Sequence, residues 1–384
     1  MLSNLATHFK GSAIRKMFNA TVGMDGLINF SVGEPDFTTP SKIIDAAVKS
    51  FQAGNTHYTP SKGLLSLREA IAEYHAHEFD CDPEKNIMVT AGGTEAIQLA
   101  LFTVLDPGDE VIVFTPAWPN YFGQIQMIGA KAVEVYTHEK NYFVPDMDDL
   151  LEHITSHTKA IIVNTPCNPT GAVYPEETLL NILNIADRYD LYVIADEVYR
   201  HIIYDDVRNR NMLQLSDKNE KVIFVNSFSK MFAMTGWRIG YAIASEKIIS
   251  AMALLHENGI SCMAQPLQEG ATFALKNCMD EIGHMRDQYN HRRDLVTKLI
   301  NQSDVISCNQ PKGAFYCFVN VQKTGLSSED FCMNLLHSKK CVVVPGNGFG
   351  SNGEGYIRLS YATSEQNIRD GVDRIHQFVD ELNL

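Results

Sequence analysis

The sequence predicts an α/β fold in which a mainly parallel sheet is sandwiched by helices and is accompanied by a smaller α+β domain. Three observations support this prediction. From residue 41 to residue 275, short runs of β-branched residues alternate with amphipathic helical patterns, as in repeated strand-helix units. The strand-like runs are apolar throughout, which is typical of parallel strands buried on both faces. After residue 276 the alternation ends, and a long charged helical stretch leads into alternating strands.

Six short runs are expected to form the strands of the large sheet. They are IMVT (87–90), EVIVF (110–114), KAIIVN (159–164), LYVIAD (191–196), VIFVN (222–226) and GYAIA (240–244). The stretches between them, such as TEAIQLALFTVL (94–105) and PEETLLNILNIADRY (175–189), carry apolar residues at helical spacing. Ligands of such sheets bind beyond the carboxyl ends of the strands, so the site is expected at that edge.

The smaller domain is expected over residues 276 to 384. Residues 1 to 40 are expected to complete it, which leaves 41 to 275 for the large domain. The predicted elements are a helix at 280–300, the strands GAFYCFVNV (313–321), CVVVP (341–345) and GYIRLSYA (355–362), and helices at 328–338 and 364–382. A cleft between two such domains is a common place for a ligand site.

One glycine motif is interpreted as a loop. Gly348, Gly350 and Gly353 spell GxGxxG after a predicted strand. A dinucleotide-binding fingerprint requires a helix after these glycines, whereas a strand follows them here. The run therefore predicts a tight turn that glycine permits.

Length and composition favour a globular protein that acts on small molecules. The chain has 384 residues, of which 45% are hydrophobic and 20% charged. Its net charge of −14 disfavours nucleic acids and anionic membranes as partners. No apolar run approaches the ~18 residues of a membrane span, and the start lacks a signal-peptide pattern. Eight scattered cysteines without CxxC pairs indicate reduced thiols and no metal site, so the cytoplasm is the expected compartment.

Candidate ligand-binding residues follow the first three predicted strands at the expected site. Gly92 and Gly93 lead into a helix whose free N–H groups can bind a phosphate, although such a pair can also be a simple turn. Trp118 is either a core residue or a platform for a flat ring. Asn168 lies between prolines in TPCNPTG, either in a rigid turn or as a positioned donor.

The next two strands end in charged residues. Asp196 ends one strand, with Tyr199 soon after it, and a buried carboxylate needs a cation or several donors. Lys230 follows the other, between Ser227 and Arg238. This lysine is a solvated charge, a phosphate clamp or a reactive amine whose pKa is lowered by burial. A ligand that uses all these groups carries a phosphate, a flat ring with a basic nitrogen, an acidic hydroxyl and a carbonyl, as pyridoxal 5′-phosphate does.

Six segments resemble, in the same order, the signature blocks of class I and II aminotransferases of fold type I. They are SVGEPDF, HYTPSKG, NTPCNPTG, ADEVY, SFSKMFAMTGWRIG and YIRLS. The resemblance covers essentially the whole chain. It implies the pyridoxal-phosphate-dependent transferase fold, pyridoxal 5′-phosphate as cofactor, and a homodimer with shared active sites.

The resemblance also implies roles for individual residues. Three residues would be catalytic. Lys230 would bond covalently to the cofactor and move the proton. Asp196 would keep the ring nitrogen protonated, and Tyr199 would form a hydrogen bond with the ring hydroxyl. The other cofactor contacts would be Gly92, Gly93, Thr94, Trp118, Asn168, Ser227 and Arg238, with Tyr58 reaching in from the neighbouring subunit.

The substrate carboxylate would lie against Gly33, Asn168 and Arg358. Strand alternation puts Arg358 on one face with Tyr356 and Ser360, and its planar fork suits a two-oxygen ligand. The alternative is an arginine that pairs with a buried acid.

The resemblance implies ping-pong transfer of an amino group from an L-amino acid to a 2-oxo acid such as 2-oxoglutarate. Some aspartate-selective relatives have Lys where this chain has Thr94, so selectivity for acidic donors is not expected. The stretch SAIRKMF (12–18) resembles aromatic or broad-range enzymes more closely, and aspartate is the open alternative donor. A carbon–sulfur β-lyase of the same fold is the alternative activity. A cofactor-sensing regulator, the third alternative, would carry a DNA-binding module ahead of these blocks. The blocks begin near residue 30, so a regulator is not expected.

Overall fold

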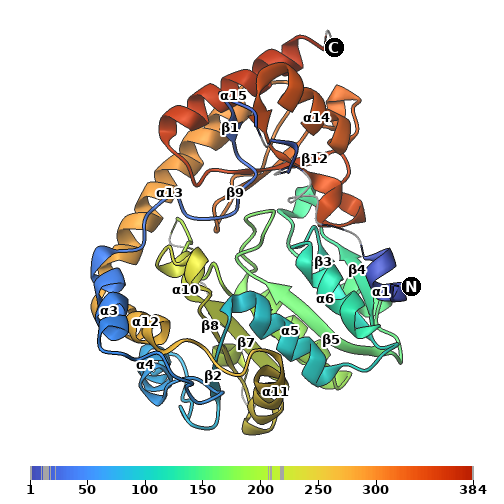
Figure 1. Ribbon diagram of the computed structural model, residues 1–384. Helices are drawn as coiled ribbons and strands as arrows, with labels where there is room; N and C mark the ends of the chain where they lie inside the picture. The colour runs from blue at the N-terminus through green and yellow to red at the C-terminus, as the bar shows by residue number, and fades with distance from the viewer. Residues whose placement is uncertain are drawn as a thin grey trace.

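A computed structural model of the chain provides the description that follows. It describes residues 2–9, 11, 17, 19–21, 23–205, 207, 210–216 and 220–382. The larger part of the molecule, at the bottom of Figure 1, surrounds one extended sheet, and the smaller part, at the top, holds the C-terminal helices.

The large sheet contains seven strands in the order β2-β8-β7-β6-β5-β3-β4. Their bounds are β2 (Ile87–Thr90), β3 (Glu110–Thr115), β4 (Lys131–Tyr136), β5 (Thr158–Asn164), β6 (Tyr192–Asp196), β7 (Val222–Ser227) and β8 (Gly240–Ile243). All pairs from β4 to β7 are parallel, whereas β8 runs antiparallel to both β2 and β7. The predicted mainly parallel sheet and its six predicted strands are therefore confirmed.

The strand β4 was not among the predicted strands. It lies at the edge of the sheet, where its side chains are mostly half-buried or exposed. Its sequence KAVEVY places Lys131 and Glu134 among apolar residues, so it lacks the continuous apolar run of a central strand.

Helices cover both faces of this sheet, which explains its apolar strands. One face carries α5 (Gly92–Val104), α6 (Asn120–Ile128) and α11 (Glu246–Gly259), and the other carries α7 (Met147–Glu152), α8 (Glu176–Arg188) and α9 (Met212–Leu215). Adjacent residues of one strand pack on opposite faces, as Ile161 and Ile162 of β5 do. A further group, α3 (Ser41–Gln52), α4 (Leu65–His75) and α12 (Gln265–Asn277), packs near β2 and β8.

The smaller part is built on a three-stranded antiparallel sheet of order β11-β12-β9. Its elements are α13 (Met279–Ile300), β9 (Tyr316–Asn320), α14 (Ser328–Lys339), β10 (Cys341–Val342), β11 (Val344–Pro345), β12 (Tyr356–Ser360) and α15 (Glu365–Asp380). The predicted single strand CVVVP is wrong in one respect, because β10 and β11 belong to different sheets. The 3-10 turns Gly346–Phe349 and Ser351–Gly353 precede β12, which confirms that the GxGxxG run is a loop.

The N-terminal residues contact both parts of the molecule. β1 (Ile28–Asn29) pairs in parallel with β10, and Figure 1 shows it beside α15. Nearer the terminus, α1 (Asn4–His8) lies by α6, where the ring of Phe9 approaches Gly123. The division of the chain at residues 40 and 275 stays a prediction.

Two further observations concern the expected surroundings of the protein. None of the described helices combines the length and the apolar character needed to cross a bilayer. All eight cysteines are described, and none forms a disulfide.

Candidate active site

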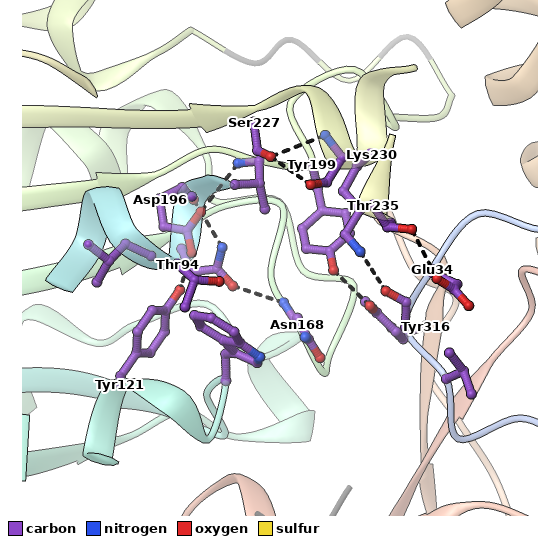
Figure 2. Close-up of a pocket in the computed structure, with 18 of the residues that line it drawn as sticks. Glu34, Thr94, Tyr121, Asn168, Asp196, Tyr199, Ser227, Lys230, Thr235 and Tyr316 are labelled. Carbon is purple, nitrogen blue, oxygen red and sulfur yellow. Dashed lines mark hydrogen bonds between the residues drawn. The ribbon is translucent and has the colours of Figure 1, made fainter. Parts of the chain in front are cut away.

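A pocket of about 290 Å³ lies beyond the carboxyl ends of the parallel strands. It is lined by most of the predicted site residues, namely Gly33, Gly93, Thr94, Trp118, Asn168, Asp196, Tyr199, Ser227, Lys230, Arg238 and Arg358. Gly92 lies directly against the Arg238 guanidinium, whereas Tyr58 does not line the pocket and is 91% exposed. Segments far apart in the sequence therefore meet here, as Figure 2 shows.

Lys230 reaches the pocket from α10 (Phe228–Met231), a single turn that begins where β7 ends. The Oγ of Ser227 caps this turn by accepting a hydrogen bond from the Ser229 backbone N–H at 3.1 Å. The Lys230 Nζ donates to the carbonyl oxygen of Gly33 at 2.5 Å. The side chain is half-buried and lines the pocket, while its amine is surrounded by protein. Burial lowers the pKa of Lys230 to about 8, and the nearby charge of Glu34 opposes this fall. A larger fraction of this amine is therefore neutral and nucleophilic near neutral pH than of an exposed lysine.

This pKa predicts how the stability of the cofactor-free protein depends on pH. Below pH 8 the charged amine is destabilising in the fold, by about 3 kcal/mol or less for a pKa that falls from 10.5 to about 8. Between pH 8 and pH 10.5 the folded amine is neutral while the unfolded one stays protonated, so the penalty disappears as the pH rises. We expect Lys230→Met to stabilise the protein more at pH 7 than at pH 10 in urea unfolding. An equal difference at both pH values would contradict the buried amine.

Asp196 ends β6 at the back of the pocket and is 3% exposed. Its Oδ2 accepts a hydrogen bond from the Tyr121 hydroxyl at 2.5 Å, and its Oδ1 accepts one from the Val198 backbone N–H at 3.3 Å. Burial raises the pKa of Asp196 to about 6, although the hydrogen bond from Tyr121 opposes this rise. A carboxylate held this way is suited to pair with a cationic group of a ligand.

The opposite end of the pocket is suited to an anion. It combines the N-terminus of α5 with the hydroxyls of Ser227 and Ser229 and the guanidinium of Arg238. Arg238 adopts a left-handed conformation (φ 55°) and donates to the carbonyl oxygen of Thr235 at 3.0 Å. Gly92 has φ 76°, and a Cβ at this position would lie 2.6 Å from the Arg238 Nη2. A glycine is therefore needed for the arginine to reach the helix end.

Arg358 lies on β12 and is 1% exposed. Ile357 and Leu359 pack into the core, so Arg358 faces the pocket as strand alternation predicts. Its Nη1 donates to the Asn168 Oδ1 at 3.1 Å and its Nη2 to the Ser31 carbonyl oxygen at 2.5 Å, while its Nε is buried without a hydrogen-bond partner among the described residues. No acid of the described residues pairs with it, so this arginine retains donors for an external anion.

Sequence reasoning missed several residues of the pocket, and two of them hold predicted residues in place. Tyr121 binds Asp196, and Tyr316 binds the hydroxyl of Tyr199 at 2.7 Å. Tyr121 lies one helical turn after Trp118, with the two rings edge to face at 5.3 Å, so that spacing was a usable signal. The sequence contains no such signal for Tyr316, because it does not show which face of β9 meets the pocket. Other missed lining residues are Val32, Glu34, Ile97, Asn164, Val198, Ser229 and Thr235.

The chain is similar to known proteins over nearly its whole length. Residues 25–375 match the family model described as aminotransferase class I and II. Over 377 residues, covering 97% of each protein, the chain is 41% identical to an aspartate aminotransferase of Pyrococcus abyssi and 40% identical to aromatic-amino-acid aminotransferase 2 of Thermococcus litoralis.

Solved structures of aminotransferases are also similar to this chain. The aromatic aminotransferase from Pyrococcus horikoshii has a TM-score of 0.91 at 39% identity and covers 96% of this chain and 99% of its own. The aspartate aminotransferase from Thermus thermophilus with maleate has a TM-score of 0.93 at 35% identity and covers 98% of this chain and 99% of its own.

Proposed function

Because this chain belongs to the class I and II aminotransferases, which use pyridoxal 5′-phosphate, we propose that Lys230 is the amine that holds the cofactor and moves the substrate proton. The observation that supports this most is that its amine lines the pocket and donates to the Gly33 carbonyl oxygen, with a pKa lowered by burial. An amine whose pKa is lowered to about 8 is partly neutral near physiological pH, and its neutral form can bond to an aldehyde and afterwards act as a base.

The residues of the pocket fit this cofactor at each end. Arg238, Ser227, Gly92, Gly93 and Thr94 at the helix end would hold the phosphate. At the other end, Asp196 would hold a proton on the ring nitrogen, because a buried carboxylate is stabilised by a cationic partner. When bound, the cofactor supplies an electron-accepting ring that stabilises negative charge at the substrate Cα.

The remaining residues would orient the ring and the substrate. Trp118 would stack on the ring, and Tyr199 and Asn168 would bond its hydroxyl. Arg358, with Asn168 and the backbone at Gly33, would bind the substrate carboxylate, for which its Nε has no competing partner among the described residues. With the carboxylate held there, the Lys230 amine would be the base that takes the proton from the substrate Cα.

The proposed donors are aromatic or a broad range of L-amino acids, and the proposed acceptor is a 2-oxo acid such as 2-oxoglutarate. Within the described residues, the cations that line the pocket are Lys230, Arg238 and Arg358, each of which has a proposed partner. Thr94 adds no charge, so a distal carboxylate finds no counterion among the described residues that line the pocket. Of the stretch SAIRKMF, residues 12–16 and 18 lie outside the described residues.

A panel of L-amino acids with 2-oxoglutarate tests this function. We expect kcat/KM for phenylalanine and tyrosine to exceed that for aspartate by about tenfold, because ring burial is favourable and an unpaired carboxylate is costly to bury. A higher value for aspartate would overturn the donor class. Turnover without any 2-oxo acid, with release of ammonia, would overturn the aminotransferase function itself.

The enzyme is proposed to be a cytoplasmic homodimer whose subunits share active sites. The exposed Tyr58 supports sharing, because its side chain is free to reach a second subunit. Eight cysteines without a disulfide support a reducing compartment.

Subunit mixing tests the position of Tyr58. In Tyr58→Ala the cofactor should bind more weakly, and in Lys230→Ala turnover should be lost. Dimers formed from both variants should regain native sites at about a quarter of positions if Tyr58 acts across the interface, since one site per mixed dimer is then intact. If Tyr58 acts within its own subunit, no gain in activity would follow mixing.

A further inference from the structure

Tyr316 is a buried tyrosine between two residues of the proposed site. It is 1% exposed and begins β9, while Tyr199 follows β6 in the large sheet. The two hydroxyl oxygens are 2.7 Å apart (Figure 2). On its other side, the Arg358 guanidinium carbon lies 4.6 Å from the centre of the Tyr316 ring. One side chain of the smaller part thus touches both a residue proposed to bind the cofactor and a residue proposed to bind the substrate.

The position of Tyr316 is fixed from several sides. Its ring packs edge to face with that of Tyr199 at a centroid distance of 5.7 Å, and against Phe315 at 4.9 Å. Its hydroxyl occupies the space that a Cβ at Gly33 would take. The tyrosine therefore has little freedom to leave the Tyr199 hydroxyl when a ligand enters the pocket.

The charges nearby decide which hydroxyl donates. Burial raises the pKa of both hydroxyls, and it raises that of Tyr199 well above its usual value, while Arg358 opposes the rise at both and is the largest opposing effect at Tyr316. The other charged groups near the pair are Asp196, which raises the pKa of Tyr199, and Lys230, whose Nζ lies 5.9 Å from the Tyr199 ring centre. Either hydroxyl can donate in this pair, and because the Arg358 cation lies beside its ring, Tyr316 is the assigned donor, which leaves the hydrogen of Tyr199 available to the pocket.

We propose that Tyr316 is a positioning residue that transmits carboxylate binding at Arg358 to the hydroxyl of Tyr199. This rests on the proposed function. A carboxylate on Arg358 neutralises the cation beside the Tyr316 ring, so the Tyr316 hydroxyl becomes a weaker donor to Tyr199. Tyr199 in turn becomes a weaker donor to the ring hydroxyl of the cofactor. Substrate entry thereby changes the acid–base behaviour of the bound cofactor through protein groups that do not react.

The test compares Tyr316→Phe with wild type as holoenzymes, using the pH titration of cofactor absorbance with and without 3-phenylpropanoate. This carboxylate has no amino group and cannot react. In wild type it should raise the midpoint of the titration. In Tyr316→Phe the resting midpoint should lie higher by about half to one pH unit, as for a lost neutral hydrogen bond, and the ligand-induced rise should be halved or less.

Affinity and turnover separate this role from a merely structural one. Tyr316→Phe keeps the ring under Arg358, so 3-phenylpropanoate should bind within about threefold of wild type, while Tyr316→Leu should weaken it about tenfold. The kcat of Tyr316→Phe should fall about threefold to tenfold with KM nearly unchanged. Tyr361→Phe is a matched control, because Tyr361 is equally buried and donates to the Ala314 carbonyl oxygen away from the pocket.

Two results would overturn the proposal. One is a Tyr316→Phe titration identical to wild type in both the resting midpoint and the ligand-induced rise. The other is a wild-type titration that does not respond to 3-phenylpropanoate. Neither result bears on the proposed function, which is judged separately by transamination and by borohydride labelling at Lys230.

Discussion

Replacing Lys230 with Ala is expected to reduce kcat by at least about 10³-fold while pyridoxal 5′-phosphate still binds. The variant removes an amine that lines the pocket, but it leaves Asp196 and the residues proposed to bind the phosphate in place. Because no other lysine of the described residues lines the pocket, the protein should also lose its covalent link to the cofactor. The measurement is borohydride reduction of the holoenzyme, followed by peptide mapping and by absorbance.

A second lysine variant provides the control for this experiment. Lys221 lies just before β7, at the other end of the strand that leads to Lys230, and contacts Asp190. Its replacement by Ala should leave both label and turnover near wild type, since surface ion pairs contribute little. A reducible link that persists in Lys230→Ala would assign the reactive amine to another residue and refute the proposed site.

Replacing Arg358 with Ala is expected to lower kcat/KM for the amino-acid donor by about 10²-fold to 10³-fold, mostly through KM. The buried guanidinium has donors left for a carboxylate, and a bidentate pair in a desolvated site is among the stronger polar interactions. The affinity for the cofactor should change by about threefold or less, because the phosphate-binding residues are untouched. Steady-state kinetics and a fluorescence titration of the cofactor measure the two effects.

Two further variants make the arginine experiment specific. Arg358→Lys keeps the charge without the planar fork, so its kcat/KM should lie between those of wild type and Arg358→Ala. Arg374→Ala removes an arginine on α15 that donates to the carbonyl oxygens of Gly26, Lys339 and Lys340 outside the pocket. It should change stability without changing donor KM. Equal losses of cofactor and donor affinity in Arg358→Ala would refute the assignment of this residue to the substrate.

Residues next to a strand end could be placed from the sequence. Asp196 ends one apolar run and Lys230 comes four positions after another, VIFVN, and parallel strands bring their carboxyl ends to one edge, so these residues were expected to be neighbours. The particular role of each residue came from the resemblance to a family and remains a proposal.

Residues whose position depends on packing between elements could not be placed. Tyr121 was missed because the strand-end argument stops at Trp118 and does not follow the helix that begins there. Tyr316 was missed because its contact with Tyr199 depends on how two sheets meet, which no local pattern specifies. The edge strand β4 was missed for a related reason, since a half-covered strand mixes charged and apolar residues.

The reversed direction of β8 has a consequence for how the site tolerates change. Ser227 and Gly240 are pairing partners in the β7–β8 ladder, and the Phe228 N–H donates to the Ile239 carbonyl oxygen at 3.1 Å. Lys230 and Arg238 therefore lie on one closed hairpin loop, and their spacing is set locally. An insertion within this loop would separate the two groups, even if every other segment of the protein kept its place.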